Sequence, residues 1–287
     1  MTLLFSLIAA VSSVGIFYLT GLYTVWYYYF LPIVLFFPMY LAAFLVFVIF
    51  AALIGLFVNK KKPITAPHPF FYWVTRQAIG QLLLFFRVKV KVSGLEKLPE
   101  GTFVAVYNHR SIIDPFVLIM KIPVKRLVMI SKPENEKIPV AGKYMHMAGF
   151  LTIDRKSPMK ARSTVEKSAE WIREGIASVA ISPEGTRSKS GKLLPFRAAP
   201  FSTARKANAP IAVITMTNTE KVFKRFPWRS TTIALHVVGS VMPDRFDEMN
   251  SFELSNYVRQ MMLDDLGEED STLPPKSADG TDSADSE

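Results

Sequence analysis

The sequence predicts an α/β protein in which a layered mixed sheet is flanked by helices, with an N-terminal hydrophobic helical hairpin in the membrane. The first observation is that residues 1–59 contain no Asp, Glu, Lys, Arg or His, and the first ionised side chains are the lysines at 60–62. The second is that short apolar runs with the period of a strand alternate with helical patterns from residue 88 onward. Such alternation is typical of a layered α/β domain.

The uncharged N-terminal segment contains two apolar runs, residues 2–20 and 30–58. Each is near or above the roughly 20 residues that span the hydrocarbon core of a bilayer. Aromatic residues at 23–29 separate the runs, and Tyr and Trp favour the interface between lipid and water. We therefore expect residues 1–59 to form a transmembrane or membrane-embedded helical hairpin. The lysines at 60–62 place the rest of the chain on the cytoplasmic side of the cell membrane.

Two alternatives share this composition. Residues 2–20 could be a cleaved signal peptide, although they lack a basic start and a clear cleavage signal. Residues 1–59 could also dip into one leaflet without crossing it. The second apolar run carries Pro32 and Pro38, which favours a tilt, a kink or a half-embedded start.

The formal net charge of +10 is unevenly distributed. Residues 264–287 contain nine acids and one lysine, a local charge of −8, so the rest of the chain carries +18. A surface this basic attracts anionic lipid headgroups, anionic cofactors or nucleic acid. The membrane segment, together with the lack of a recognised nucleic-acid motif, favours lipid and cofactor phosphates over nucleic acid. The acidic segment 264–287 is rich in Ser and Asp and is expected to be a disordered tail.

Several chemistries are excluded by what the sequence lacks. It has no cysteine, which excludes a disulfide, a thiol nucleophile and a thiolate metal site. Its four histidines lack the short spacing of zinc ligands, so we expect no metal site. The sequence also contains neither a P-loop nor the Gly-x-Ser-x-Gly elbow of serine hydrolases.

The remaining chain divides into a linker and one large domain. Residues 60–87 contain three prolines followed by an aromatic and apolar run, which predicts a linker and an interfacial helix. Residues 88–263 are expected to form the α/β domain. Strands are expected at 88–92, 102–107, 127–130, 177–182, 211–216 and 233–238. Helices are expected at 115–121, 158–174, 200–207 and 252–263.

A polar turn follows the strand at 102–107 and places His109 five residues before Asp114. Asp114 precedes Pro115, and this dipeptide suits the start of a helix, so Asp114 is a candidate N-cap. A loop that ends at Asp114 allows its carboxylate to hold one imidazole nitrogen and to fix the tautomer. The other nitrogen can then take a proton from a substrate hydroxyl. The only nucleophile adjacent to the pair is Ser111. Direct attack by the substrate hydroxyl is therefore the simpler mechanism. The alternative is that Asp114 only caps the helix and His109 is an idle loop residue.

A second polar turn follows the strand at 177–182. It offers a small hinge, a hydroxyl and a guanidinium that can bind phosphate in bidentate fashion. Its residues are Glu184, Gly185, Thr186 and Arg187. Arg155, which follows Asp154, is a second candidate for a phosphate contact. Functional groups gather in the loops that leave the carboxyl ends of strands, and both turns have this placement. The alternative is a solvated surface turn with ordinary ion pairs.

With these residues the chain resembles the glycerolipid acyltransferase family, specifically its bacterial-type 1-acylglycerol-3-phosphate acyltransferases. The similarity covers roughly residues 90–212. One match is to the catalytic block of the family and comprises Asn108, His109, Ser111 and Asp114. The other is to its phosphate-binding block, residues 184–187, and the order and separation of the two blocks agree. Residues that look like the intervening acceptor-binding block are Lys132, Pro139, Gly142, Gly149, Phe150, Asp154 and Arg155.

The resemblance implies a reaction and a set of substrates. A fatty acyl group moves from an acyl thioester, either acyl-CoA or acyl-carrier protein, to the free hydroxyl of lysophosphatidate, giving phosphatidate for phospholipid synthesis. It implies His109 as base and Asp114 as its orienter, with no permanently bound cofactor. The substrate-binding residues that it implies are Glu184, Gly185, Thr186, Arg187, Arg155 and Lys132.

The chain departs from the family pattern downstream of these blocks. Where the family often has Lys and Gly after a Phe, this chain has Arg197, Ala198 and Ala199 after Phe196, and Val213 replaces the second proline of the final block. These changes bear on acyl-chain and acceptor preference more than on the reaction. Two rival functions stay open: acyl transfer to another lysophospholipid, and a catalytically silent membrane lipid-binding protein of the same fold.

Overall fold

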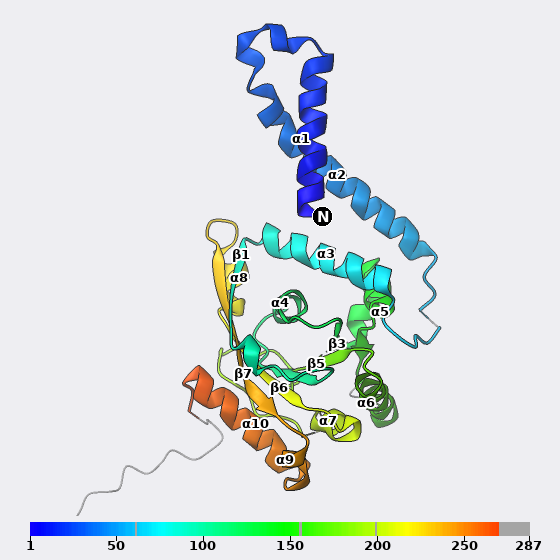
Figure 1. Ribbon diagram of the computed structural model, residues 1–287, viewed down its shortest axis with the longest axis vertical. Coiled ribbons are helices and arrows are strands. Elements are labelled where there is room, and N and C mark those ends of the chain that lie inside the picture. The colour runs from blue at the N-terminus through cyan, green and yellow to red at the C-terminus, as the bar shows by residue number, and fades with distance from the viewer. Residues whose placement is uncertain (61, 155–156, 199, 270–287) are drawn as a thin grey trace, which may run out of the picture. The chain divides into compact units, whose positions relative to one another are not determined.

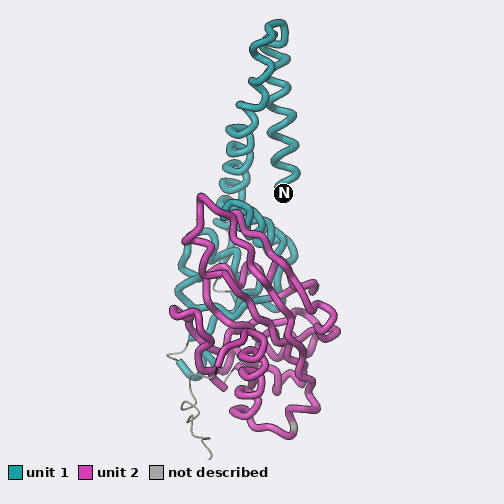
Figure 2. The backbone as a smooth tube through the Cα atoms, turned by 90° about the vertical axis from the view of Figure 1, so that its left-hand side faces the viewer, with its two compact units in different colours: residues 1–86, 128–161 teal, residues 87–127, 162–287 magenta. Residues whose placement is uncertain are grey.

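The computed structural model describes residues 1–60, 62–154, 157–198 and 200–269, with residue 247 described by its backbone alone. The chain divides into two compact units (Figure 2). The first comprises residues 1–86 and 128–161, and the second comprises residues 87–127 and 162–287.

The first unit begins with the helical hairpin that the sequence predicts. Helices α1 (Thr2–Leu19) and α2 (Leu31–Leu56) are joined by two short 3-10 turns, η1 (Leu22–Thr24) and η2 (Trp26–Tyr28) (Figure 1). Both helices are long and apolar enough to cross a membrane, judged by length and composition. Pro38 lies inside α2, where its ring removes one backbone hydrogen bond.

Aromatic and polar contacts link the hairpin to α3 (Pro69–Phe85). The ring of Phe5 in α1 packs edge-on against Tyr40 in α2, with 5.9 Å between centroids. The Tyr40 hydroxyl donates to Gln81 Oε1 at 2.8 Å, and Gln81 Nε2 donates to Thr2 Oγ1 at 2.7 Å. Because polar groups in apolar surroundings need partners, this chain of hydrogen bonds ties α3 to both helices of the hairpin.

A second contact holds the end of the hairpin within the same unit. The unit also contains η4 (Pro133–Lys137), α5 (Ala141–Met147) and the two-residue strand β4 (Leu151–Thr152), which pairs in parallel with β3 (Leu127–Ser131). Tyr144 of α5 donates its hydroxyl to the carbonyl of Ala51 at 2.8 Å and packs against Phe71 of α3.

Helix α3 leaves apolar side chains exposed, including Trp73, Leu84 and Phe85.

The second unit is built on a sheet whose strands lie in the order β1-β7-β6-β2-β5. The bounds are β1 (Val88–Ser93), β2 (Val104–Tyr107), β5 (Ser178–Ile181), β6 (Ile211–Thr217) and β7 (Thr231–Val241). Strands β6 and β7 are antiparallel, whereas β1 with β7, β2 with β5 and β2 with β6 are parallel. The predicted mixed sheet is therefore confirmed.

The central strands form the core and position the loops that follow them. Every side chain of β2 and β5 is buried, as expected for parallel strands covered on both faces. The register pairs Val104 with Val179 and Val106 with Ile181, so the two strands end side by side. The loops after β2 and β5 consequently leave the same edge of the sheet.

Helices and short turns surround the sheet. They are η3 (Leu95–Lys97), α4 (Asp114–Lys121), α6 (Pro158–Arg173), α7 (Phe201–Ala207), η5 (Thr219–Lys221), α8 (Val222–Arg225), α9 (Asp244–Asp247) and α10 (Ser251–Leu266). Helix α10 begins with a capping box between Asn250 and Glu253 and ends at Gly267, whose φ of 63° is the left-handed conformation of a helix C-cap.

The structure corrects the expected C-terminal boundary. Helix α10 extends to Leu266, and the chain stays ordered through Glu269, so residues 264–269 are not part of a disordered tail. The cause is a set of tertiary hydrogen bonds that local composition does not reveal. Asp265 accepts from Thr215 at 2.5 Å, and Glu268 accepts from Arg110 at 2.5 Å. Residues 270–287 lie outside the described part of the chain.

Candidate active site

His109 and Asp114 meet in the loop between β2 and α4. The imidazole Nδ1 lies 2.8 Å from Asp114 Oδ2; the side chain of His109 is 22% exposed and that of Asp114 is fully buried. The same carboxylate oxygen accepts the backbone N–H groups of Arg110 and Ser111, each at 2.7 Å. A carboxylate that makes three such contacts has its position fixed, and it favours the tautomer that carries the proton on Nδ1. His109 Nε2 is then an acceptor.

One part of the expectation for Asp114 is wrong. Helix α4 is preceded by Ile113 in the capping position, and no side chain caps its first turn. Asp114 is instead the first residue of the helix, and its carboxylate turns back to bind the loop. The five-residue spacing is compatible with this contact because the intervening residues form a turn, in which Asp114 N donates to the carbonyl of Ser111 at 3.3 Å.

Asn108 and Tyr107 fix the end of β2 from which His109 emerges. The Asn108 side chain is buried and makes two hydrogen bonds with the backbone of Met216 in β6, at 2.9 and 2.7 Å. The ring of Tyr107 packs edge-on against the imidazole, with 6.0 Å between centroids. Burial, with the nearby carboxylates of Asp114 and Glu184, raises the pKa of Tyr107, so its hydroxyl stays protonated.

Glu184 joins the two polar turns. Its Oε1 accepts the backbone N–H of His109 at 2.6 Å and its Oε2 accepts that of Leu194 at 3.0 Å, in a side chain that is buried. A further link runs from Ser188 N to the carbonyl of His109 at 2.8 Å. The structure therefore brings the two predicted turns together. Both oxygens of Glu184 are engaged by the protein backbone, which positions this residue as a brace for the histidine.

The environment of Glu184 shifts its acidity. Burial raises the pKa of this carboxyl from its usual 4.5 to about 7, and the hydrogen bonds from His109 and Leu194 act in the opposite direction. The charged form is disfavoured by the low-polarity surroundings and favoured by the two N–H donors.

The rest of the second turn faces outward. Gly185 has a φ of 70°, a left-handed conformation that glycine adopts at no steric cost, so the chain turns sharply after Glu184. Thr186 and Arg187 are exposed. Arg187 forms no hydrogen bond or ion pair with the part of the chain that the structure describes. Its guanidinium is thus available to an anionic ligand.

Two further predicted residues remain. Lys132 precedes η4 in the first unit and is exposed. Arg155 lies outside the described residues. Among the residues that are described, no group of three or more His, Asp or Glu side chains could hold a metal ion.

Sequence reasoning missed a brace on the far side of the histidine loop. Arg110 Nη2 donates to Glu268 Oε1 at 2.5 Å, with side chains that are 11% and 18% exposed, and Leu193 N donates to Glu268 Oε2 at 2.7 Å. Arg110 is adjacent to His109, and Leu193 is adjacent to the residue that binds Glu184. The pair is separated by 158 positions, so no local pattern could have revealed it.

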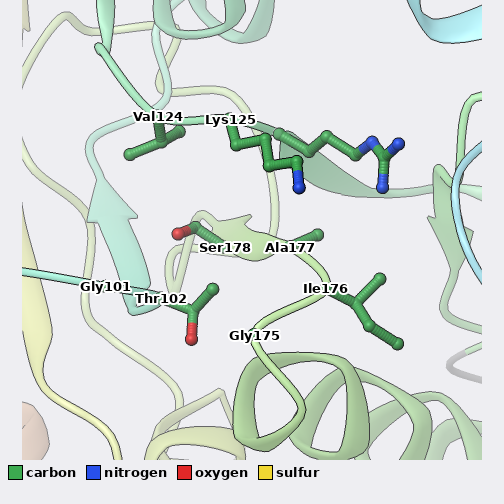
Figure 3. Close-up of a pocket in the computed structure, with 9 residues that line it drawn as sticks. Gly101, Thr102, Val124, Lys125, Gly175, Ile176, Ala177 and Ser178 are labelled. Carbon is green, nitrogen blue, oxygen red and sulfur yellow. The ribbon is translucent and has the colours of Figure 1, made fainter. Parts of the chain in front are cut away.

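The cavity in Figure 3 is separate from this site. Its volume is 260 Å³, and Thr102, Lys125, Gly175 and Ser178 are among the residues that line it. Thr102 precedes β2 and Ser178 begins β5. Because the two polar turns follow the other ends of these strands, the cavity lies at the opposite edge of the sheet.

An imidazole that a buried carboxylate orients at the carboxyl edge of a parallel pair of strands has the geometry of a general base. Residues 89–217 match the family model described as Acyltransferase. This stretch of the chain is therefore similar to the acyltransferase family.

Curated proteins that are similar to this chain share one named activity. A 1-acyl-sn-glycerol-3-phosphate acyltransferase of Saccharomyces cerevisiae is 26% identical over 217 residues, which cover 71% of this chain and 71% of the relative. The alpha form from Homo sapiens is 29% identical, covering 66% of this chain and 68% of that protein. The chloroplastic BAT2 enzyme of Brassica napus is 36% identical over a shorter stretch, 47% of this chain and 39% of the relative.

A solved structure supports the fold. The 1-acyl-sn-glycerophosphate acyltransferase PlsC of Thermotoga maritima superposes with a TM-score of 0.55 at 22% identity, over 70% of this chain and 82% of that chain.

Proposed function

We propose that this protein is a membrane enzyme that transfers a fatty acyl group from an acyl thioester to the free hydroxyl of 1-acylglycerol 3-phosphate, forming phosphatidate. The observation that carries the proposal is the 2.8 Å contact between His109 Nδ1 and Asp114 Oδ2, inside the domain that matches the acyltransferase model. The choice of 1-acylglycerol 3-phosphate as the acceptor is supported by the names of the similar proteins from Saccharomyces cerevisiae and Homo sapiens.

The chemistry uses His109 as the general base. Asp114 holds the Nδ1 proton, so Nε2 takes the proton of the acceptor hydroxyl as its oxygen attacks the thioester carbonyl. The new C–O bond forms, the tetrahedral intermediate collapses, and the C–S bond breaks. The departing sulfur takes the proton from the imidazolium, which gives a free thiol and restores the neutral histidine. Asp114 stabilises the imidazolium while it exists.

The acceptor phosphate is assigned to the outward cations. Arg187 is the first of these, because its guanidinium is exposed beside the Glu184 brace and bidentate pairing suits a phosphate. Thr186 and the turn at Gly185 belong to the same loop. Lys132 and Arg155 are assigned as further contacts on the strength of the sequence pattern. Glu184 acts on the acceptor through the position of His109, since a carboxylate facing a phosphate is unfavourable.

The donor and the membrane complete the proposal. We assign acyl-CoA or acyl-carrier protein as the thioester donor, with no cofactor held between turnovers. The hairpin α1–α2 is the membrane anchor, and the three lysines at 60–62 put the catalytic domain on the cytoplasmic side.

An acceptor panel tests this function. The purified full chain is given an acyl-CoA donor and, in parallel, 1-acylglycerol 3-phosphate, lysophosphatidylcholine, lysophosphatidylethanolamine or glycerol 3-phosphate. Thiol release and product mass are both recorded, and the absence of cysteine from the chain removes any enzyme thiol background. Rapid release with lysophosphatidate and a phosphatidate product support the proposal. Turnover with another acceptor alone, or thiol release with none, contradicts it.

A further inference from the structure

Residues 219–230 form a basic and aromatic loop between β6 and β7 that the proposed reaction does not use. The loop contains η5 and α8 (Figure 1). Four of its side chains are basic and exposed, and they form no ion pair with the described residues. They are Lys221, Lys224, Arg225 and Arg229. The single acid, Glu220, turns a carboxylate oxygen away from solvent.

Aromatic side chains accompany these cations. Trp228 is 86% exposed and Phe223 is 44% exposed. Large exposed aromatic groups on a folded domain mark an interaction site, because water solvates them poorly. Tryptophan next to lysine and arginine is the composition of the interface between lipid and water, where the ring lies at headgroup level and the cations meet lipid phosphates.

The loop is also tied to the point where the chain leaves the apolar helix α3. Arg87 is the second residue after Phe85, the last residue of that helix. Its Nη1 donates to the carbonyl of Pro227 at 3.1 Å, and its own carbonyl accepts from Thr231 N at 3.3 Å. The loop is therefore anchored, at the tip and at the start of β7, to a residue that follows exposed apolar side chains in the sequence.

We propose that residues 219–230 dock on the anionic headgroup surface of the phospholipid bilayer, with Trp228 in the interface and the four basic side chains on lipid phosphates. Charge complementarity selects this occupant, and the exposure of Trp228 favours a bilayer, where the indole ring lies at headgroup level, over the surface of an acidic protein. The docking adds a second attachment to the one made by the hairpin. It goes beyond the proposed reaction and does not depend on catalysis.

A single environment-sensitive label tests the docking in the full chain. Because the protein has no cysteine, Ser230→Cys creates a unique thiol two residues from Trp228. Ser251→Cys at the start of α10 is the matched control position in the same unit. Each labelled protein is placed in nanodiscs of phosphatidylcholine alone or mixed with phosphatidylglycerol, in the His109→Ala background as well, so that docking is measured apart from activity.

The proposal predicts brighter, blue-shifted emission from the label at 230 when phosphatidylglycerol is present, reversed by high salt, and no change from the label at 251. Trp228→Ala should abolish the shift, whereas Phe252→Ala, which removes another exposed aromatic group, should preserve it. An aqueous spectrum at position 230 in both lipids overturns the proposal. So does a shift that appears only when an acidic protein is added.

Neutralising the cations gives an independent measurement. The triple variant Lys224→Gln, Arg225→Gln, Arg229→Gln should dock more weakly, by roughly fivefold for each charge removed. The reason is that a basic residue near an anionic leaflet contributes about 1 kcal/mol. The matched triple variant carries glutamine at three exposed basic positions of the same unit, namely Lys121, Lys125 and Arg173. Equal losses from the two triple variants would show that only total charge matters, and would overturn a specific docking loop.

Discussion

Asp114→Asn separates the charge of the orienting group from its shape. All three hydrogen bonds are accepted by Oδ2, and Oδ1 is buried without a hydrogen-bond partner among the described residues. An asparagine can therefore place its carbonyl oxygen in the Oδ2 position and keep the loop. What it removes is the negative charge opposite the imidazolium that forms during the reaction.

The size of the effect follows from the 2.8 Å contact. Two unit charges at this distance attract by about 6 kcal/mol at an effective dielectric constant of about 20. The 22% exposure of His109 brings in solvent screening, which we take to halve this value to about 3 kcal/mol, or about 10²-fold in kcat. The buried amide N–H2 in the Oδ1 position costs about 1–3 kcal/mol of stability.

Thiol release under saturating donor and acceptor measures kcat, and thermal unfolding in the same detergent measures the fold. Asp114→Asn should lose about 10²-fold in kcat with KM for both substrates little changed. Asp114→Ala should lose stability as well, because the N–H groups of Arg110 and Ser111 are left without their acceptor. A folded Asp114→Asn enzyme with wild-type kcat would refute the role of the charge.

Three further variants probe the surroundings of the base. Arg187→Ala should raise KM for lysophosphatidate by roughly 10- to 100-fold, the worth of a charge-assisted hydrogen bond, with an unchanged melting temperature because the side chain is exposed; an unchanged KM speaks against a phosphate contact. Glu268→Ala leaves Arg110 without its partner and should lower the melting temperature by roughly 5 °C, whereas the exposed neighbour in Glu269→Ala should not; equal effects would deny the brace. Glu184→Gln should become more stable relative to wild type as pH rises from 4.5 to about 7, by up to about 3 kcal/mol. The reason is that ionising a carboxyl whose pKa is raised by burial costs native stability over that range; a pH-independent difference in melting temperature contradicts this.

Much of the fold was predictable because its main signals are local. The absence of charge from residues 1–59 predicted the hairpin, and alternation of Val with Lys predicted β1. The buried runs that became β2 and β5 were predicted within two residues of their bounds. These patterns show which side chains are buried, and the spacing of buried side chains distinguishes a helix from a strand.

The elements that escaped prediction depend on distant partners. Helix α5 has few residues of its own to define it and is held by Tyr144, whose hydroxyl binds the carbonyl of Ala51. The end of α10 is acidic, which by composition indicates disorder, yet Asp265 binds Thr215 and His236 in the sheet. Tertiary contacts of this kind outweigh local propensity and leave no periodic trace.

The site shows the same division. The spacing of His109 and Asp114 allowed their contact without requiring it, and the structure shows the contact at 2.8 Å. The role of Glu184 was harder to predict, since sequence alone suggested a ligand contact and the structure shows two backbone N–H groups on its oxygens. Every residue other than proline has a backbone N–H group, so the sequence does not show which of these groups Glu184 binds. Only the structure does.

Phosphatidate formation by purified His109→Ala, compared with wild type in the same micelles, tests the central claim most directly. The account predicts a loss of about 10²- to 10⁴-fold in turnover, with membrane association and melting temperature retained. A folded His109→Ala protein that makes phosphatidate at the wild-type rate would contradict it.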